Sequence, residues 1–188
     1  MSMRVQLAFL SLCVIVLLGC HVSTPEKASD TVSLMARLGQ WGRYDEAIRV
    51  AQDWMKKHPD AISHNLALYD QIALIYLMKA SKDTARKEEW IQQAVTYYDK
   101  YLSVHQKGDV DLALYETGRG FEAAGDLSTA NGCLYYGRAV KSFEEEVPFI
   151  QGESYTAYGK TTPLEPVRRE NEKALERVKG KLTRAGCK

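Results

Sequence analysis

The sequence has almost no net charge and few residues that break helices. Its 25 Lys and Arg residues stand against 24 Asp and Glu residues, which gives a formal net charge of +1. Because phosphate binding needs a clear cationic excess, this balance argues against nucleic acid as a partner. Of the five prolines, only Pro59 lies between Glu26 and Val147. A stretch of this length with a single helix breaker predicts an all-helical protein.

Residue patterns that carry catalysis or bind metals are also missing. The four histidines are scattered, and no cluster of His, Cys or Asp has the spacing of metal ligands. The sequence has no Gly-x-Ser-x-Gly nucleophile motif and no phosphate-binding loop. We therefore expect no metal, no cofactor and no enzymatic activity. With 45% hydrophobic and 26% charged residues in 188, the chain is expected to form about one globular domain.

The N-terminus carries an apolar run that is too short to cross a membrane. Arg4 precedes the run 5–18, which ends in Leu17-Leu18-Gly19-Cys20. A membrane-spanning helix needs about 20 residues, whereas this length suits the core of a signal peptide. The ending resembles the lipobox of bacterial lipoproteins. The resemblance implies cleavage before Cys20 and lipidation of that cysteine; a short transmembrane anchor or an ordinary cleaved signal peptide is the alternative.

The residues after the lipobox indicate where such a lipoprotein would go. In Gram-negative lipoproteins an Asp after the cysteine signals retention in the inner membrane, and here that residue is His21. The resemblance therefore implies a lipid-anchored protein at the periplasmic face of the outer membrane, if the source is Gram-negative. We assign 1–19 to the signal peptide and the polar segment 20–27 to a lipidated tether.

Two further cysteines remain after Cys13 and Cys20 are accounted for. Cys133 and Cys187 would lie in an oxidising compartment, where a disulfide is allowed. The alternative is a buried free Cys133 and a frayed Cys187. A disulfide would require the expected last helix, 167–184, to fold back over the helix that contains Cys133.

A repeated helical pattern occupies the middle of the chain. In the segment 42–59, a turn-forming Gly42 is followed by Ala47, by Ala51 and Trp54 on the same helix face, and by Pro59. This segment resembles the second half of a tetratricopeptide repeat, and looser copies surround Ala94 and Ala130. The resemblance implies that these small residues lie where paired helices cross.

The repeats predict an all-α fold of stacked antiparallel helical hairpins, a tetratricopeptide-like solenoid of about three repeats. Residues 28–145 form this repeat domain, 146–166 an irregular loop, and 167–188 a capping helix and tail. Tyrosines on the second helices are expected in the core between hairpins. The expected helices are 28–40, 44–58, 61–80, 85–106, 110–124, 127–145 and 167–184.

In the repeat family, the outward stripe of the first helices lines a concave groove that holds peptide. Carried over by motif, this partner-binding groove is expected at Asp70, Leu74, Leu77, Met78, Leu112, Tyr115, Arg119 and Glu122. Apolar area combined with one Arg and two acids suits a peptide or protein. The alternative is that the tether, the loop or the last helix covers the groove.

Together these patterns indicate a non-enzymatic, membrane-anchored scaffold or adaptor of the bacterial cell envelope, serving outer-membrane, pilus or secretion assembly. An envelope protein in the groove and the membrane are its expected partners. Two other hypotheses are a small-molecule binding or transport accessory and an enzyme with a dispersed site.

Overall fold

The structure, a computed structural model, is all-helical apart from one small β-hairpin, and it describes residues 26–104, 112–157 and 160–187. An all-α fold was predicted and is confirmed. The signal peptide 1–19, Cys20 and the tether up to residue 25 lie outside the described residues. The described helices are α2 (Ala28–Gln40), α3 (Tyr44–Lys57), α4 (Ala67–Lys82), α5 (Lys87–Val104), α6 (Leu112–Leu127), α7 (Gly132–Glu146) and α8 (Glu165–Arg184), with short 3-10 helices at Pro59–His64 and Val147–Ile150.

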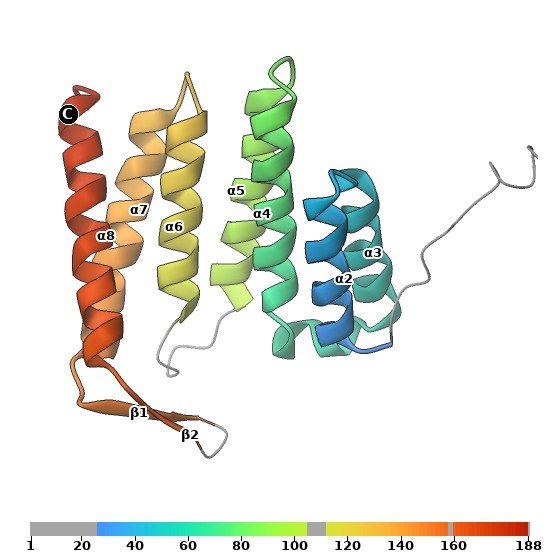
Figure 1. The fold of residues 1–188 in the computed structure, drawn as a ribbon, viewed down its shortest axis with the longest axis horizontal. Helices are drawn as coiled ribbons and strands as arrows, with labels where there is room; N and C mark the ends of the chain where they lie inside the picture. Colours follow the sequence, from blue (N-terminus) through green and yellow to red (C-terminus); the bar gives the residue numbers. More distant parts are fainter. Residues whose placement is uncertain (1–25, 105–111, 158–159, 188) are drawn as a thin grey trace, which may run out of the picture.

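The helices lie side by side, with α2 and α3 at one end and α8 at the other (Figure 1). Each helix packs against the next along the chain, and α4 additionally contacts both α2 and α6, while α6 contacts α8. The connections from α2 to α3 and from α6 to α7 are short, at residues 41–43 and 128–131. None of the described helices is long and apolar enough to cross a membrane.

Small residues lie in the turn after α2 and at the helix contacts of α3 and α5. Gly42 lies in the turn after α2 with a φ of 73°, a conformation that favours glycine, and so turns the chain into α3. Ala47 and Ala94 are fully buried, as expected for residues at helix contacts. Among the second-helix tyrosines, Tyr97, Tyr98, Tyr101 and Tyr135 are buried and Tyr136 is partly buried.

The third small residue, Ala130, is not at a helix contact. It is exposed in the turn between α6 and α7, so this part of the predicted repeat register was wrong. Helix α6 continues through Gly125 to Leu127, and the absence of a side chain at Gly125 makes room for the ring of Tyr136. A Cβ on Gly132 would lie 3.2 Å from the carbonyl oxygen of Gly125. Glycines, rather than Ala130, therefore bring α6 and α7 together.

The segment 146–166 is also more regular than predicted. After the 3-10 helix, strands β1 (Ser154–Ala157) and β2 (Lys160–Pro163) pair antiparallel, with Ser154 opposite Pro163. Figure 1 shows this hairpin extending beyond the ends of the helices. Helix α8 begins at Glu165, two residues earlier than expected, with Pro166 in its first turn, where proline is tolerated.

Candidate functional site

A cleft of about 210 Å³ opens between α4, α5 and α6. We call it the α4–α6 cleft. Its wall on α4 is formed by residues spaced four and three apart, which share one helix face. The wall on α6 repeats this spacing. The lining residues are Asp70, Leu74 and Leu77 from α4, Tyr98 from α5, and Glu116, Arg119, Gly120 and Ala123 from α6.

Half of the predicted groove residues meet in this cleft. Asp70, Leu74, Leu77 and Arg119 line it together, although the first and last are 49 positions apart in the sequence. Leu74 is exposed over 42% of its surface, which is high for a leucine in a helical core. Helices α4 and α6 therefore both contribute to one hollow.

The other predicted groove residues face elsewhere. Met78 is partly buried, and its sulfur lies 3.7 Å from where a Cβ on Gly39 would sit, so it packs towards α2. Tyr115 packs on Phe143 with ring centroids 5.8 Å apart. Glu122 is buried and binds α8. The side chain of Leu112 lies outside the described part of the structure.

The prediction missed four lining residues, Tyr98, Glu116, Gly120 and Ala123. On α6 the predicted stripe was one residue out of register, because Glu116 and Gly120 follow Tyr115 and Arg119 directly. The pattern 116, 119, 120 and 123 was present in the sequence as a helix-face spacing. Tyr98 was expected in the core, and its 2% exposed surface agrees with this, but the residue also lines the cleft.

Gly120 gives the Tyr98 ring its place against α6. A Cβ at this position would lie 2.1 Å from Cζ and 2.5 Å from the hydroxyl oxygen of Tyr98. The phenol therefore occupies the space that any other residue at 120 would fill. Its ring also packs edge-on against Phe121, with centroids 5.7 Å apart. These contacts fix the ring at the base of the cleft.

The polar groups of the cleft are charged but poorly paired. Burial, and then the negative charge of Glu116, raise the pKa of Asp70 to about 6, against the opposing effect of Arg119. Burial, and then Asp70 and Glu116, also raise the pKa of Tyr98 well above its usual range, so the hydroxyl stays neutral. The guanidinium of Arg119 lies 5.9 Å from the ring centroid of Tyr115, at the edge of the cation–π range.

Two larger hollows lie elsewhere on the surface. One of about 400 Å³ lies between the α4–α5 turn and Thr129, but three of its charged groups are paired locally: Arg86 pairs with Glu89, and Glu88 accepts hydrogen bonds from Ser128 and Thr129. The other, of about 390 Å³, lies beside the starts of α2 and α4 and is lined by neutral residues. Only the α4–α6 cleft, of these three, combines apolar walls with charged groups that lack such local partners.

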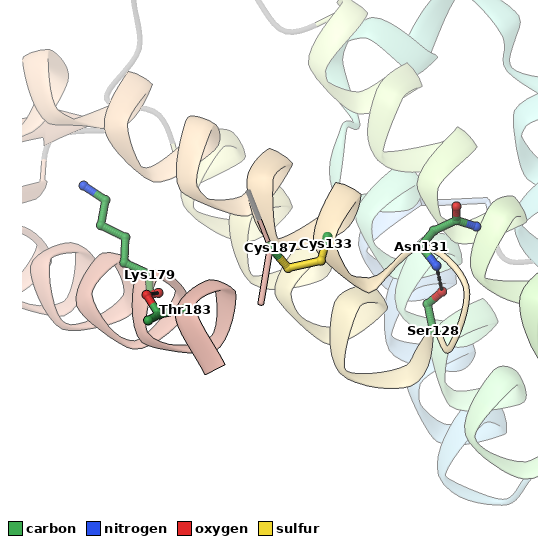
Figure 2. Close-up of a disulfide and its surroundings, with 6 residues drawn as sticks. All are labelled: Ser128, Asn131, Cys133, Lys179, Thr183 and Cys187. Atoms are coloured by element: carbon green, nitrogen blue, oxygen red, sulfur yellow. Dashed lines mark hydrogen bonds between the residues drawn. A yellow bond between two sulfur atoms is a disulfide. The ribbon is translucent and has the colours of Figure 1, made fainter. Parts of the chain in front are cut away.

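A disulfide fixes the far end of the helical array. Cys133 in the first turn of α7 is bonded to Cys187, just beyond α8, with the two Cα atoms 5.5 Å apart (Figure 2). The connection just before α7 is held by a hydrogen bond of 2.8 Å that the amide of Asn131 donates to Oγ of Ser128. The predicted pairing of these two cysteines is therefore present in the structure, and α8 lies over α7 as it requires.

Within the described residues, no group of three or more His, Cys, Asp or Glu side chains is arranged to hold a metal ion. Comparison of the chain with protein-family models, curated proteins and solved structures found no match.

Proposed function

We propose that this chain is a lipid-anchored scaffold protein of the bacterial envelope that binds a segment of a partner protein in the α4–α6 cleft. Its body is interpreted as a stack of tetratricopeptide-like hairpins, with α8 as the cap. The observation that carries the proposal is the cleft itself, where Asp70 and Leu74 of one hairpin face Arg119 of the next. Its volume of about 210 Å³ is below the range of about 300–1,000 Å³ typical of small-molecule sites, which favours a protein segment as the ligand.

The anchor part of the proposal rests on Leu17-Leu18-Gly19-Cys20. Several acyl chains, at about 0.8 kcal/mol per buried methylene, would hold the protein on the membrane. Labelling with a fatty-acid analogue tests this directly: the wild-type chain should be labelled and sediment with membranes, and Cys20→Ala should not be labelled. Recovery of unlabelled wild-type protein in the soluble fraction would contradict the lipid anchor. Separation of the two membranes tests the outer-membrane location.

The binding part is tested by site-specific photocrosslinking in the producing cell. A photoreactive phenylalanine analogue at position 74 would stand at the mouth of the cleft, since Leu74 is 42% exposed. Leu134 is 59% exposed and lies on α7, so the same analogue at position 134 is the matched control. We expect a discrete protein adduct from position 74 and not from position 134. Identical adduct patterns, or none from position 74, would overturn the binding proposal.

A further inference from the structure

The α4–α6 cleft contains acceptor groups that the protein leaves without donors. Among the described residues, no hydrogen bond or ion pair reaches the carboxylate of Asp70 or of Glu116. The hydroxyl of Tyr98 likewise has no hydrogen-bond partner there, although the residue is only 2% exposed. Buried tyrosine hydroxyls usually find a partner. The ring of Tyr98 is buried, but its hydroxyl oxygen is not sealed in the core and opens onto the cleft, so a group from outside can complete the site.

The net charge of the cleft indicates which kind of ligand group it can bind. Two carboxylates face one guanidinium, so a second cation is favoured and an anion is not. Arg119 does not serve as that cation, because its exposed side chain lies over Tyr115 and forms no ion pair with Asp70 or Glu116. The neutral hydroxyl of Tyr98 can accept a hydrogen bond from a cationic N–H as well as donate one.

The apolar residues of the cleft determine the shape of the ligand. Leu74, Leu77 and Ala123 line the space beside the carboxylates. Lys and Arg side chains combine a chain of methylenes with a charged end. The methylenes are buried along apolar surface, while the charged end reaches polar partners. The cleft therefore offers complementary surface to both parts of such a side chain.

We propose that the α4–α6 cleft binds a single Lys or Arg side chain projecting from the partner segment. Its methylenes lie along Leu74, Leu77 and Ala123, and its cationic end donates hydrogen bonds to Asp70, Glu116 and Tyr98. This inference rests on the proposed scaffold function and specifies the chemistry of the partner at this site.

The test uses two probes that differ only in the terminal ammonium group of the side chain. They are Nα-acetyl-lysine N-methylamide and Nα-acetyl-norleucine N-methylamide, which keeps the straight chain and lacks the amine. Each is titrated into the full-length lipoprotein in detergent micelles while the backbone amides of Leu77 and Gly120 are followed by NMR. The lysine probe should give saturable shifts and the norleucine probe should not. The double variant Asp70→Asn/Glu116→Gln should weaken binding of the lysine probe by about tenfold or more. Arg119→Gln, which removes the competing cation, should tighten it several-fold.

The control variant Asp53→Asn/Glu172→Gln removes two exposed carboxylates outside the cleft and should leave the affinity unchanged. Equal responses to the two probes, no saturation by the lysine probe, or an unchanged affinity in the cleft double variant would each overturn the inference. The crosslinking experiment separates this outcome from failure of the scaffold function. If the position-74 adduct persists in the cleft double variant, the cleft binds a partner but not through a cationic side chain.

Discussion

The described carboxylates on the two faces of α6 are in opposite environments: those on one face are paired with cations and those on the other are not. On the face towards α8, Glu122 accepts two hydrogen bonds of 2.7 Å from Arg177 and also pairs with Lys181 at 2.7 Å. Burial alone would raise the pKa of Glu122, but these hydrogen bonds hold it below its usual value. On the cleft face, Asp70 beside Glu116 has a raised pKa. One face is arranged to stabilise the fold, and the other retains charges that weaken it.

The face towards α8 needs its polar contacts because α8 brings little apolar surface. Only Asn171, Ala174 and Val178 are buried along its 20 residues. The amide of Asn171 donates hydrogen bonds to the backbone oxygen of Phe143 and to Oε2 of Glu146, at 3.1 and 2.5 Å. The ion pairs and the disulfide hold this helix where hydrophobic burial is small. The described charges of the cleft have no comparable contacts within the fold, which is why we propose a binding role for them.

The disulfide should have the largest effect on stability. Cys187→Ser opens a link between residues 54 apart, which in the chain-entropy model costs about 4 kcal/mol of unfolding free energy. Urea unfolding measures the loss, and a reductant should shift the wild-type curve towards that of the variant while leaving the variant unchanged. Affinity for the lysine probe should be preserved, because the cleft lies between α4 and α6. Two free thiols in unfolded, unreduced mature protein would contradict the bond.

Gly120→Ala should have the next largest effect and should act on both stability and binding. The added Cβ would lie 2.1 Å from Cζ of Tyr98, a buried ring that must move, and overpacking of this kind costs about 2 kcal/mol. Gly137→Ala is the matched control, since nothing lies within 4 Å of its added Cβ on the exposed side of α7. The higher helix propensity of alanine should stabilise this variant by about 0.5–1 kcal/mol. Thermal melts that move in the same direction for both variants would show that Tyr98 does not pack on Gly120.

The helices were predictable because their signals are local. Pro59, Gly42 and the apolar spacing around Ala47 act within a few residues, and the structure follows them. Ala130 lies instead in the turn between α6 and α7, and the close contact there is made by Gly125 with the Tyr136 ring of the next helix, which residue spacing does not encode. The hairpin at 154–163 carries no alternation of apolar and polar residues strong enough to predict strands.

The cleft was predicted in part for a related reason. A stripe on α4 needs only helix periodicity, and Asp70, Leu74 and Leu77 lie where expected. On α6 the choice between the Glu116 face and the Glu122 face depends on where α8 packs. Arg177 and Lys181 of α8 form ion pairs with Glu122, so Glu122 faces α8 and does not line the cleft. The sequence contains both faces and no local signal that distinguishes them.

The same substitution at two positions of α6 tests the contrast between its faces. Glu122→Gln should lower the free energy of unfolding by about 1–2 kcal/mol, since it weakens charge-assisted hydrogen bonds to a half-exposed Arg177. Glu116→Gln should cost almost nothing, because no described side chain pairs with it. The pKa of Glu122 is lowered in the folded state, so its contribution is present at neutral pH and is lost as the pH falls below about 4.5. Denaturation at pH 7 and pH 3 measures this, and equal losses for both variants at pH 7 would remove the contrast.

Asp70→Asn should give the smallest change, and a gain rather than a loss. The folded protein raises the pKa of Asp70 to about 6, above the usual value of about 3.9, so ionisation of this carboxyl destabilises the fold. The amide cannot ionise, and we expect it to stabilise the protein by about 1 kcal/mol at pH 7, because the cleft leaves Asp70 partly solvated. Since the wild-type carboxyl takes up its proton between about pH 6 and pH 4, this advantage should disappear across that range.

Unfolding curves at pH 7 and pH 4 measure the effect. Asp53→Asn on the exposed face of α3 is the control, and its stability difference from the wild type should not change with pH. A variant that is more stable at pH 7 yet no longer binds the lysine probe would show that Asp70 is retained for binding at the expense of stability. An equal stability difference at both pH values would show that its carboxylate is not destabilised in the cleft.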